Sequence, residues 1–345
     1  MIDVHVHLRD WGQKAKETVE HGIRVASLCG IRHLSDMPNT SPALVDSQTV
    51  LDRLALASGA SRRHRVSYSV NMGLTADPDQ IAQAVSTYNE LFPKVLSLKM
   101  FAGHSTGNMG LVALDEQRTV FQTLSRLDYR GVLMIHCEKE RLIRSGLYRP
   151  GQFETHSDAR PAESEVESIR DMITLAKETA FKGKVHICHI STKAGLGIVV
   201  KAREEGVDIS CGATAHHNLL TRKDASNHDW YLKMNPPLRS EEDRTAIYNG
   251  LVNGQIDFVK SDHAPHTLED KEKGASGIPG FAGSLILLKR LKADKVPHDR
   301  LIELFCTNAG KRFDIEVDSV LPDRLDWRIA QARKEYPFDP FGAFI

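Results

Sequence analysis

Short runs of β-branched and apolar residues alternate along this chain with longer amphipathic segments. Eight short runs are candidate strands, at residues 2–7, 31–37, 64–70, 95–101, 131–137, 184–190, 207–213 and 256–262. Apolar residues recur at helical spacing over residues 14–29, 42–58, 77–91, 114–127, 161–181, 193–205 and 240–253, and two more helices are expected near 283–293 and 298–309. This alternation predicts repeated βα units around a parallel sheet, and eight strands suffice to close a (β/α)8 barrel.

Helix start signals and the end of the chain refine this architecture. Ser41-Pro42 and Asp77-Pro78 each place a capping side chain before a proline that suits a first helical turn, and Ser240 with Asp243 resembles a capping box. We expect an α/β fold, a TIM-like barrel over residues 1–313. Residues 314–345 contain several prolines and are expected to form a C-terminal tail packed on that barrel.

The composition narrows the classes of function. Lys and Arg together number 45, as do Asp and Glu, so the formal net charge of zero gives no sign of a nucleic-acid or membrane surface. The five cysteines are widely spaced without a C-x-x-C pair, which is typical of reduced thiols in a cytosolic protein. No apolar run is long enough to span a membrane, and the N-terminus lacks the pattern of a secretory leader. We therefore expect a cytoplasmic protein that binds a small molecule.

The first predicted strand contains the clearest chemical signal, in DVHVHLRD at residues 3–10. Side chains on a strand alternate between two faces, so His5 and His7 point to the same side and could hold one metal ion together. The alternative is an exposed edge strand with two histidines that have no function. The rest of the chain favours the metal site, because polar groups recur where the other predicted strands end.

In a (β/α)8 barrel the functional groups lie at the carboxyl ends of the strands. Besides the histidine pair, the groups found there are Asn39, Lys99, His136, His189, His216, His217 and Asp262. Imidazole together with carboxylate suits zinc and its neighbours better than magnesium or calcium. Four of these histidines together with the aspartate already exceed the number of ligands that one catalytic zinc needs, so we expect two metal ions with bridging ligands. A lysine there would be costly as an ammonium, whereas its neutral amine could capture CO2 and become an anionic ligand.

Nine segments, in order from residue 3 to about 310, together resemble the dihydroorotases, a cyclic amidohydrolase group of the amidohydrolase superfamily. They are DVHVHLRD, DMPNTSPAL, LKMFAGHSTGNMG, HCE, CHIST, HHNLLT, KMNPPLR, DHAPHTLEDK and SGIPGF. The resemblance implies reversible, zinc-dependent cyclisation of N-carbamoyl-L-aspartate to (S)-dihydroorotate plus water in de novo pyrimidine biosynthesis. The MPNT string favours this group over hydantoinase-like and allantoinase-like relatives.

The same resemblance implies roles for the polar groups at the strand ends. The implied ligands are His5, His7 and Asp262 for one zinc ion and His136 and His189 for the other, with Lys99, N6-carboxylated by CO2, as the bridge. Asp262 is also expected to be catalytic, because it could take a proton from the attacking water and pass it to the departing amide nitrogen. His216 and His217 are expected to support the ligands rather than to bind metal.

A further set of residues is expected to bind the substrate. Arg9 could form a bidentate contact to a carboxylate, and Asn39 and His266 could complete the clamp, as the matching positions do in the family for the α-carboxylate of dihydroorotate. The contacts that the resemblance implies for the ring amides are Asn235 and the main chain around Pro279 and Gly280.

Two glycine-bearing loops, 104–110 and 266–280, lie beside these residues, and one of them is expected to close over bound substrate. Ser105 or Thr106 would then touch the substrate.

Other expectations concern modules, partners and rival functions. Many relatives have an accessory β-sandwich, and most or all of it should be absent here because the first strand begins at residue 3. We expect a homodimer and consider aspartate transcarbamoylase as a partner. The alternatives are another cyclic amidohydrolase, of hydantoinase or allantoinase type, and a catalytically silent scaffold for aspartate transcarbamoylase. Loss of metal ligands would mark the scaffold, and none is lost.

Overall fold

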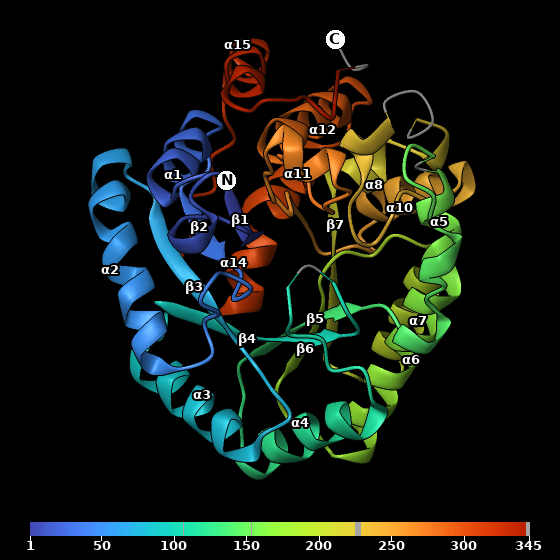
Figure 1. The fold of residues 1–345 in the computed structure, drawn as a ribbon. Coiled ribbons are helices and arrows are strands. Elements are labelled where there is room, and N and C mark those ends of the chain that lie inside the picture. The colour runs from blue at the N-terminus through green and yellow to red at the C-terminus, as the bar shows by residue number, and fades with distance from the viewer. Residues whose placement is uncertain (106, 153, 225–228, 343–345) are drawn as a thin grey trace.

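Parallel strands arranged in chain order form the centre of the molecule in a computed structural model that describes residues 1–105, 107–152, 154–224 and 229–342 (Figure 1). The strands are β1 (Ile2–Val6), β2 (His33–Asp36), β3 (Ser67–Gly73), β4 (Val95–Ala102), β5 (Val132–Cys137), β6 (Lys184–Ile187), β7 (Ile209–Thr214) and β8 (Phe258–Lys260). A parallel bridge between Val6 and His263 joins the end of β8 to β1, and the His7 N–H donates to the His263 oxygen at 2.7 Å. The predicted eight-stranded barrel is confirmed.

Amphipathic helices surround the barrel (Figure 1). They are α1 (Val19–Leu28), α2 (Ser47–His64), α3 (Pro78–Leu91), α4 (Leu114–Arg126), α6 (Ala162–Glu178), α7 (Lys193–Glu204), α10 (Glu241–Val252) and α12 (Phe281–Ala293). Each lies where a helix was predicted, and most of them bury one face, whereas α12 is buried nearly all round. In α4, for example, Val120, Phe121 and Leu124 are fully buried in the apolar core.

Shorter elements occupy the connections, and most of them were not predicted. They are η1 (Trp11–Gln13), η2 (Glu140–Leu142), η3 (Ser145–Leu147), α5 (Glu154–Ala159), α8 (Ala215–Leu219), η4 (Asp229–Leu232), α11 (Leu268–Glu272), α13 (His298–Ile302), η5 (Glu303–Thr307), α14 (Asn308–Phe313), α15 (Leu325–Ala332) and η6 (Arg333–Glu335). Helices of one or two turns are too short to display a 3.6-residue period, which explains the omission. The helix predicted near 298–309 is present as α13, η5 and the start of α14.

The start of α2 corrects one expectation. Ser41-Pro42 does not begin a helix, since α2 starts only at Ser47, where the Asp46 side chain accepts a hydrogen bond from the Thr49 N–H. The preceding segment turns back on itself, with the Leu44 N–H donating to the Pro38 oxygen. The other two start signals are confirmed: Asp77 caps α3 and Ser240 caps α10.

The segment after α14 runs over the outside of the barrel. Its helix α15 packs on α12 and α1. Phe338 and Phe341 beyond it are buried, and a Cβ built on Gly283 of α12 would lie only 2.3 Å from the Phe341 ring. The described residues contain one sheet only.

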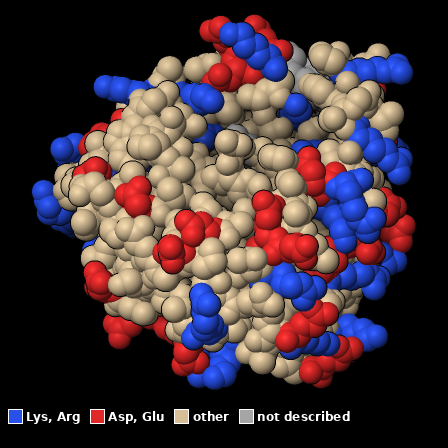
Figure 2. All heavy atoms as spheres, turned by 60° about the horizontal axis from the view of Figure 1, so that its bottom comes forward, with Lys and Arg blue, Asp and Glu red and all other residues tan. Residues whose placement is uncertain are grey.

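The surface shows no dominant charge on the face drawn in Figure 2, where Lys and Arg side chains are interspersed with Asp and Glu. This agrees with the equal numbers of basic and acidic residues in the sequence. Within the described ranges, no helix has both the length and the apolar character needed to cross a membrane.

Candidate metal centre and substrate pocket

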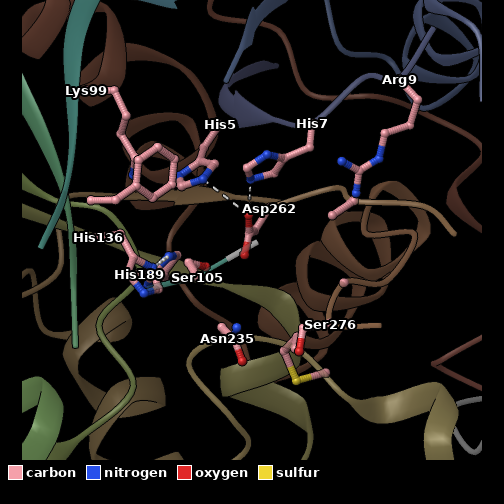
Figure 3. Close-up of a pocket in the computed structure, with 14 residues that line it drawn as sticks. His5, His7, Arg9, Lys99, Ser105, His136, His189, Asn235, Asp262 and Ser276 are labelled. Atoms are coloured by element: carbon pink, nitrogen blue, oxygen red, sulfur yellow. Dashed lines mark hydrogen bonds and ion pairs between the residues drawn. The ribbon is translucent and has the colours of Figure 1, made fainter. Parts of the chain in front are cut away.

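Three of the predicted metal ligands meet where β1 and β8 end (Figure 3). His5 and His7 each place Nε2 close to Oδ1 of Asp262, at 3.2 and 3.1 Å, and one ligand atom from each of the three lies within 4.8 Å of the others. Asp262 has a φ of 50°, a left-handed conformation that is uncommon for a residue other than glycine. The barrel seam thus brings together side chains that are about 255 positions apart in the sequence.

The electrostatics of this trio suit a cation. Burial lowers the pKa of His5 well below its ordinary value, although the nearby Asp262 carboxylate opposes that shift. Burial alone would raise the pKa of Asp262, but His5 and His7 outweigh it and hold the pKa well below its ordinary value. The lowered pKa of Asp262 keeps its carboxylate ionised, which is the form that binds a metal ion.

The histidines that end β5 and follow β6 form a second pair beside the first. His136 Nδ1 lies 3.1 Å from His189 Nε2, and the rings of His189 and His5 are 5.5 Å apart. Burial lowers the pKa of both imidazoles, well below the ordinary value in His189. Figure 3 shows this pair on one side of Asp262, with Arg9 on the other.

Hydrogen bonds from one ring nitrogen of His7 and one of His136 decide which nitrogen of each ring faces the other predicted ligands. His7 Nδ1 lies 2.7 Å from the Asn39 amide oxygen, and His136 Nε2 lies 3.1 Å from the Glu138 carboxylate. Both oxygens only accept hydrogen bonds, so each ring donates there and turns a lone pair inward. A lone pair facing a carboxylate or another imidazole at about 3 Å is favourable when a cation lies between them. The donor set therefore fits bound zinc ions.

Glu138 is itself held firmly. The Arg160 guanidinium donates to both carboxylate oxygens of Glu138, from Nε at 3.0 Å and from Nη2 at 2.8 Å. Burial would raise the pKa of Glu138, but Arg160 and His136 hold it well below the ordinary value. Glu138 is thus a fixed acceptor for His136. It lies in the HCE string, although the sequence alone gave it no role.

Lys99 lies in the same pocket, on β4. Its side chain is completely buried, its Nζ donates to Cys188 Sγ at 2.8 Å, and Nζ lies 4.7 Å from the centre of the Phe101 ring. The pocket wall that includes Lys99 also contains the four histidines and Asp262. The six predicted metal ligands therefore line one cavity.

Arg9 provides the cationic wall of that cavity. It is buried, its Nε donates to the Pro265 oxygen at 3.2 Å, and its Nη2 lies 3.3 Å from His266 Nε2. Burial lowers the pKa of Arg9 to about 10, so the guanidinium stays charged at neutral pH. His266 touches Arg9 and the Ser276 oxygen, behind the lining residues. The arrangement can bind an anionic group beside the metal ligands.

A buried network beneath Arg9 fixes the turn after β1. Asp36 accepts the Leu8 N–H at 2.9 Å, and Arg53 donates to the Leu8 oxygen at 2.6 Å. Arg53 also donates to the Asp36 carboxylate at 2.7 Å, and the Tyr68 hydroxyl donates to the same oxygen at 2.7 Å. Both polar main-chain groups of the residue between His7 and Arg9 are therefore held.

Asn235 forms part of the opposite wall. His156 Nε2 lies 3.0 Å from the Asn235 amide oxygen and 3.1 Å from the Met234 oxygen, so this ring nitrogen carries the proton and donates. The NH2 group of Asn235 is then the part of the amide left to face a ligand. His217 helps to hold this loop, since its Nε2 lies 3.1 Å from the Pro236 oxygen.

The loop after β8 completes the cavity. Ala264, Ser276 and Gly277 line the cavity, and the fully buried Lys271 ammonium donates to the Lys233, Ala275 and Gly277 oxygens at 2.9, 3.0 and 2.9 Å. These contacts tie the β8 loop to the β7 loop.

Pro279 and Gly280, predicted to contact the substrate, lie outside the lining residues, and the Gly280 N–H donates to His263 Nδ1 at 3.1 Å. Their proposed role stays a prediction. Of the two residues expected on the lid loop, Ser105 lines the cavity, and Thr106 lies outside the described residues.

A parallel (β/α)8 barrel with histidines, a lysine and an aspartate gathered at its strand ends is the arrangement typical of metal-dependent amidohydrolases. Residues 1–195 match the family model described as "Dihydro-orotase-like", and curated dihydroorotases match nearly the whole chain. The chain belongs to the dihydroorotase-like family. The dihydroorotase of Thermococcus kodakarensis is 32% identical over 99% of this chain and 74% of its own length, and that of Desulforapulum autotrophicum is 30% identical over 99% and 78%.

Solved structures support the same fold. The L-hydantoinase (dihydropyrimidinase) from Arthrobacter aurescens superposes with a TM-score of 0.82 at 24% identity, covering 93% of this chain and 72% of its own. A D-hydantoinase from Thermus sp. superposes with a TM-score of 0.77 at 23% identity, covering 90% and 70%.

Proposed function

We propose that this protein is a dihydroorotase that interconverts N-carbamoyl-L-aspartate and (S)-dihydroorotate in de novo pyrimidine biosynthesis. The observation that supports this best is the buried Arg9 guanidinium in the wall of the metal-ligand cavity. Dihydroorotate has a carboxylate next to its cyclic amide, so its binding site needs a cation beside the ring to contact that carboxylate. The relatives that cover 99% of the chain have the same name.

We propose that two zinc ions bind in this cavity. His5, His7 and Asp262 would hold one ion, and His136 and His189 the other, because the inward-facing lone pairs of His7 and His136 suit cations. Lys99, N6-carboxylated by CO2, would bridge the two, which its burial among these ligands supports. Zinc bound in such a site supplies a Lewis acid that polarises a carbonyl and makes a water more acidic.

The protein's own groups would perform the proton transfers and the positioning. Asp262, ionised and fixed between two histidines, would accept the proton of the attacking water and deliver it to the amide nitrogen as the ring opens. In the direction of cyclisation the same carboxylate would return the proton. Arg9 would hold the substrate carboxylate, and His266, which contacts Arg9, and Asn39, which contacts His7, would complete the clamp. The NH2 group of Asn235 would donate to a ring carbonyl.

We further propose a cytoplasmic homodimer, with aspartate transcarbamoylase as a candidate partner. The five buried, unpaired cysteines are consistent with a reducing compartment. Sedimentation of the purified chain, alone and mixed with the transcarbamoylase, tests both associations. A monomer that sediments unchanged in the mixture would contradict them.

An absorbance assay of dihydroorotate hydrolysis by zinc-loaded protein, run beside hydantoin and allantoin, tests the proposed activity. We expect dihydroorotate to be the preferred substrate. Turnover of hydantoin or allantoin without turnover of dihydroorotate would reassign the enzyme to another cyclic amidase. Full zinc binding without turnover of any of the three would favour the scaffold.

A further inference from the structure

Three segments that are far apart in the sequence form a buried polar cluster next to Asp262. Glu17 precedes α1, His263 follows Asp262 directly, and Tyr336 follows η6 in the C-terminal tail. The Tyr336 hydroxyl donates to Glu17 Oε1 at 2.9 Å, and His263 Nε2 lies 3.2 Å from the same oxygen. The side chains of Glu17 and His263 are completely buried.

The His263 ring is held on its edges and on one face. The Gly280 N–H donates to Nδ1 at 3.1 Å, so Nδ1 is the acceptor and Nε2 carries the proton donated to Glu17. Phe281 stacks on the ring, with centroids 3.8 Å apart and an interplanar angle of 7°. A ring fixed in this way leaves its own main chain little freedom.

The main chain of His263 transmits this restraint to the proposed metal ligand. The His263 N–H donates to Ser261 Oγ at 3.0 Å, and its oxygen accepts the His7 N–H at 2.7 Å. Asp262 lies between these anchored groups with its φ of 50°. A non-glycine residue stays in this costly conformation only when its surroundings hold it there.

Tyr336 is in turn fixed by the tail. Next to it, Glu335 pairs with Arg24 of α1 at 2.5 Å, and His21 bridges Glu335 and Glu17 with contacts of 3.3 and 3.2 Å. Phe338, two residues further on, is buried and stacks on Tyr231. The tail thus places one hydroxyl against Glu17 and His263 from outside the barrel.

We propose that Tyr336 is a positioning residue for Asp262, acting through Glu17 and His263. By holding Glu17 it keeps the His263 ring, and with it the Asp262 main chain, in the conformation that aims the carboxylate at His5 and His7. The inference rests on the proposed function of Asp262 as zinc ligand and proton carrier. The C-terminal tail, although remote in sequence, then belongs to the apparatus that supports the site.

The test uses Tyr336→Phe and Glu17→Gln in the full chain, with Tyr248→Phe as the matched control. The Tyr248 hydroxyl also donates to a carboxylate, Asp294, but on the outer surface. We expect zinc affinity, measured by competition with a chelator, to fall at least threefold in both test variants. We expect kcat for dihydroorotate to fall at least fivefold while KM stays within twofold, and the control to match the parent.

The effects of the two substitutions on zinc affinity and kcat should not be additive. Because they break one path, the double variant should resemble the more damaged single variant. Zinc affinity and kcat that stay at the parent level in both folded single variants would overturn the proposal, as would losses that merely follow the unfolded fraction seen by circular dichroism. If the parent binds zinc but leaves dihydroorotate intact, the proposed function fails, and the zinc affinities still decide this inference.

Discussion

The Arg53 guanidinium holds the main-chain oxygen of Leu8 at 2.6 Å. This single contact reaches the residue between His7, proposed to bind zinc, and Arg9, proposed to bind the substrate carboxylate. Asp36 holds the N–H of the same residue. The geometry of two functional side chains therefore depends on a buried ion pair that touches neither metal nor substrate.

Replacing Arg53 by Met should destabilise the protein strongly. The change leaves the Asp36 carboxylate buried without its cation, which costs about 3–5 kcal/mol in comparable cases. Urea unfolding measures this loss. Arg130→Met, which breaks an exposed pair with Asp128, should leave the free energy of unfolding almost unchanged. Equal effects of the two substitutions would show that the buried network adds nothing.

Asp262→Asn should abolish turnover without unfolding the chain. The amide keeps the size of the carboxylate but can neither accept the proton nor balance the charge of the cation, so kcat should fall by a factor of roughly 10³ or more. Zinc content, measured by mass spectrometry, should also fall. Retention of a tenth of the parent kcat would remove Asp262 from the proposed mechanism.

Arg9→Lys should weaken the binding of dihydroorotate. A lysine cannot make the bidentate contact, so KM should rise on the order of tenfold or more. Dihydrouracil, which has the same ring without the carboxylate, provides the control: we expect the parent to hydrolyse it more slowly than dihydroorotate, and the substitution to change that rate little. Similar losses for both ring compounds would indicate damage to the pocket rather than loss of the clamp.

Lys99→Gln should remove the proposed carbamate. Parent protein loaded with zinc in ¹³C-bicarbonate should show a carbamate carbon signal in its NMR spectrum, and the variant should lack that signal. We also expect the variant to lose at least one equivalent of zinc, because an uncharged amide is a poor bridging ligand. A parent spectrum without the signal at full zinc occupancy would exclude the carboxylated lysine.

His33 should make the stability of the protein depend on pH below about 6.5. Burial, with a smaller effect of Lys94, lowers the pKa of His33 to about 4. The unfolded chain therefore binds the extra proton first, and stability is lost as the pH falls from 6.5 towards 4. By pH 5 the loss should reach about 1–2 kcal/mol.

Replacing His33 by Gln should flatten this part of the profile, which urea unfolding at pH 7 and pH 5 would reveal. His298→Gln, at an exposed position, is the control and should leave the slope unchanged. An unchanged slope in the His33 variant would mean that the histidine is equally protonated in both states.

The barrel, and the gathering of histidines, Lys99 and Asp262 at its rim, could be predicted because their signals are local. Strand and helix periods repeat within about ten residues, and His5 with His7 lie on one strand face, so the pattern itself gives the pairing. Parallel strands of a barrel also end at one rim, which is why Lys99 and His189 could be placed together before any coordinates were known.

The supporting residues could not be predicted because their partners are distant and their own environment looks ordinary. Glu138 lies two residues after His136, but only the structure shows that its carboxylate accepts a hydrogen bond from the His136 ring and so orients it. Lys271 reads as a surface residue of a charged run and is in fact buried against three main-chain oxygens. Ser276 and Gly277 line the cavity, three positions before Pro279 and Gly280, the pair that the SGIPGF string suggested.

The meeting of β1 with the end of β8 has a consequence for biogenesis. His5 and His7 leave the ribosome before Asp262, the third member of their trio, which is made some 250 residues later. A partly synthesised or partly folded chain therefore has an incomplete set of the proposed zinc ligands. Under the proposed ligand set, tight zinc binding would report that the barrel has closed, and zinc would shift the equilibrium from unfolded chains open to proteolysis towards the folded protein.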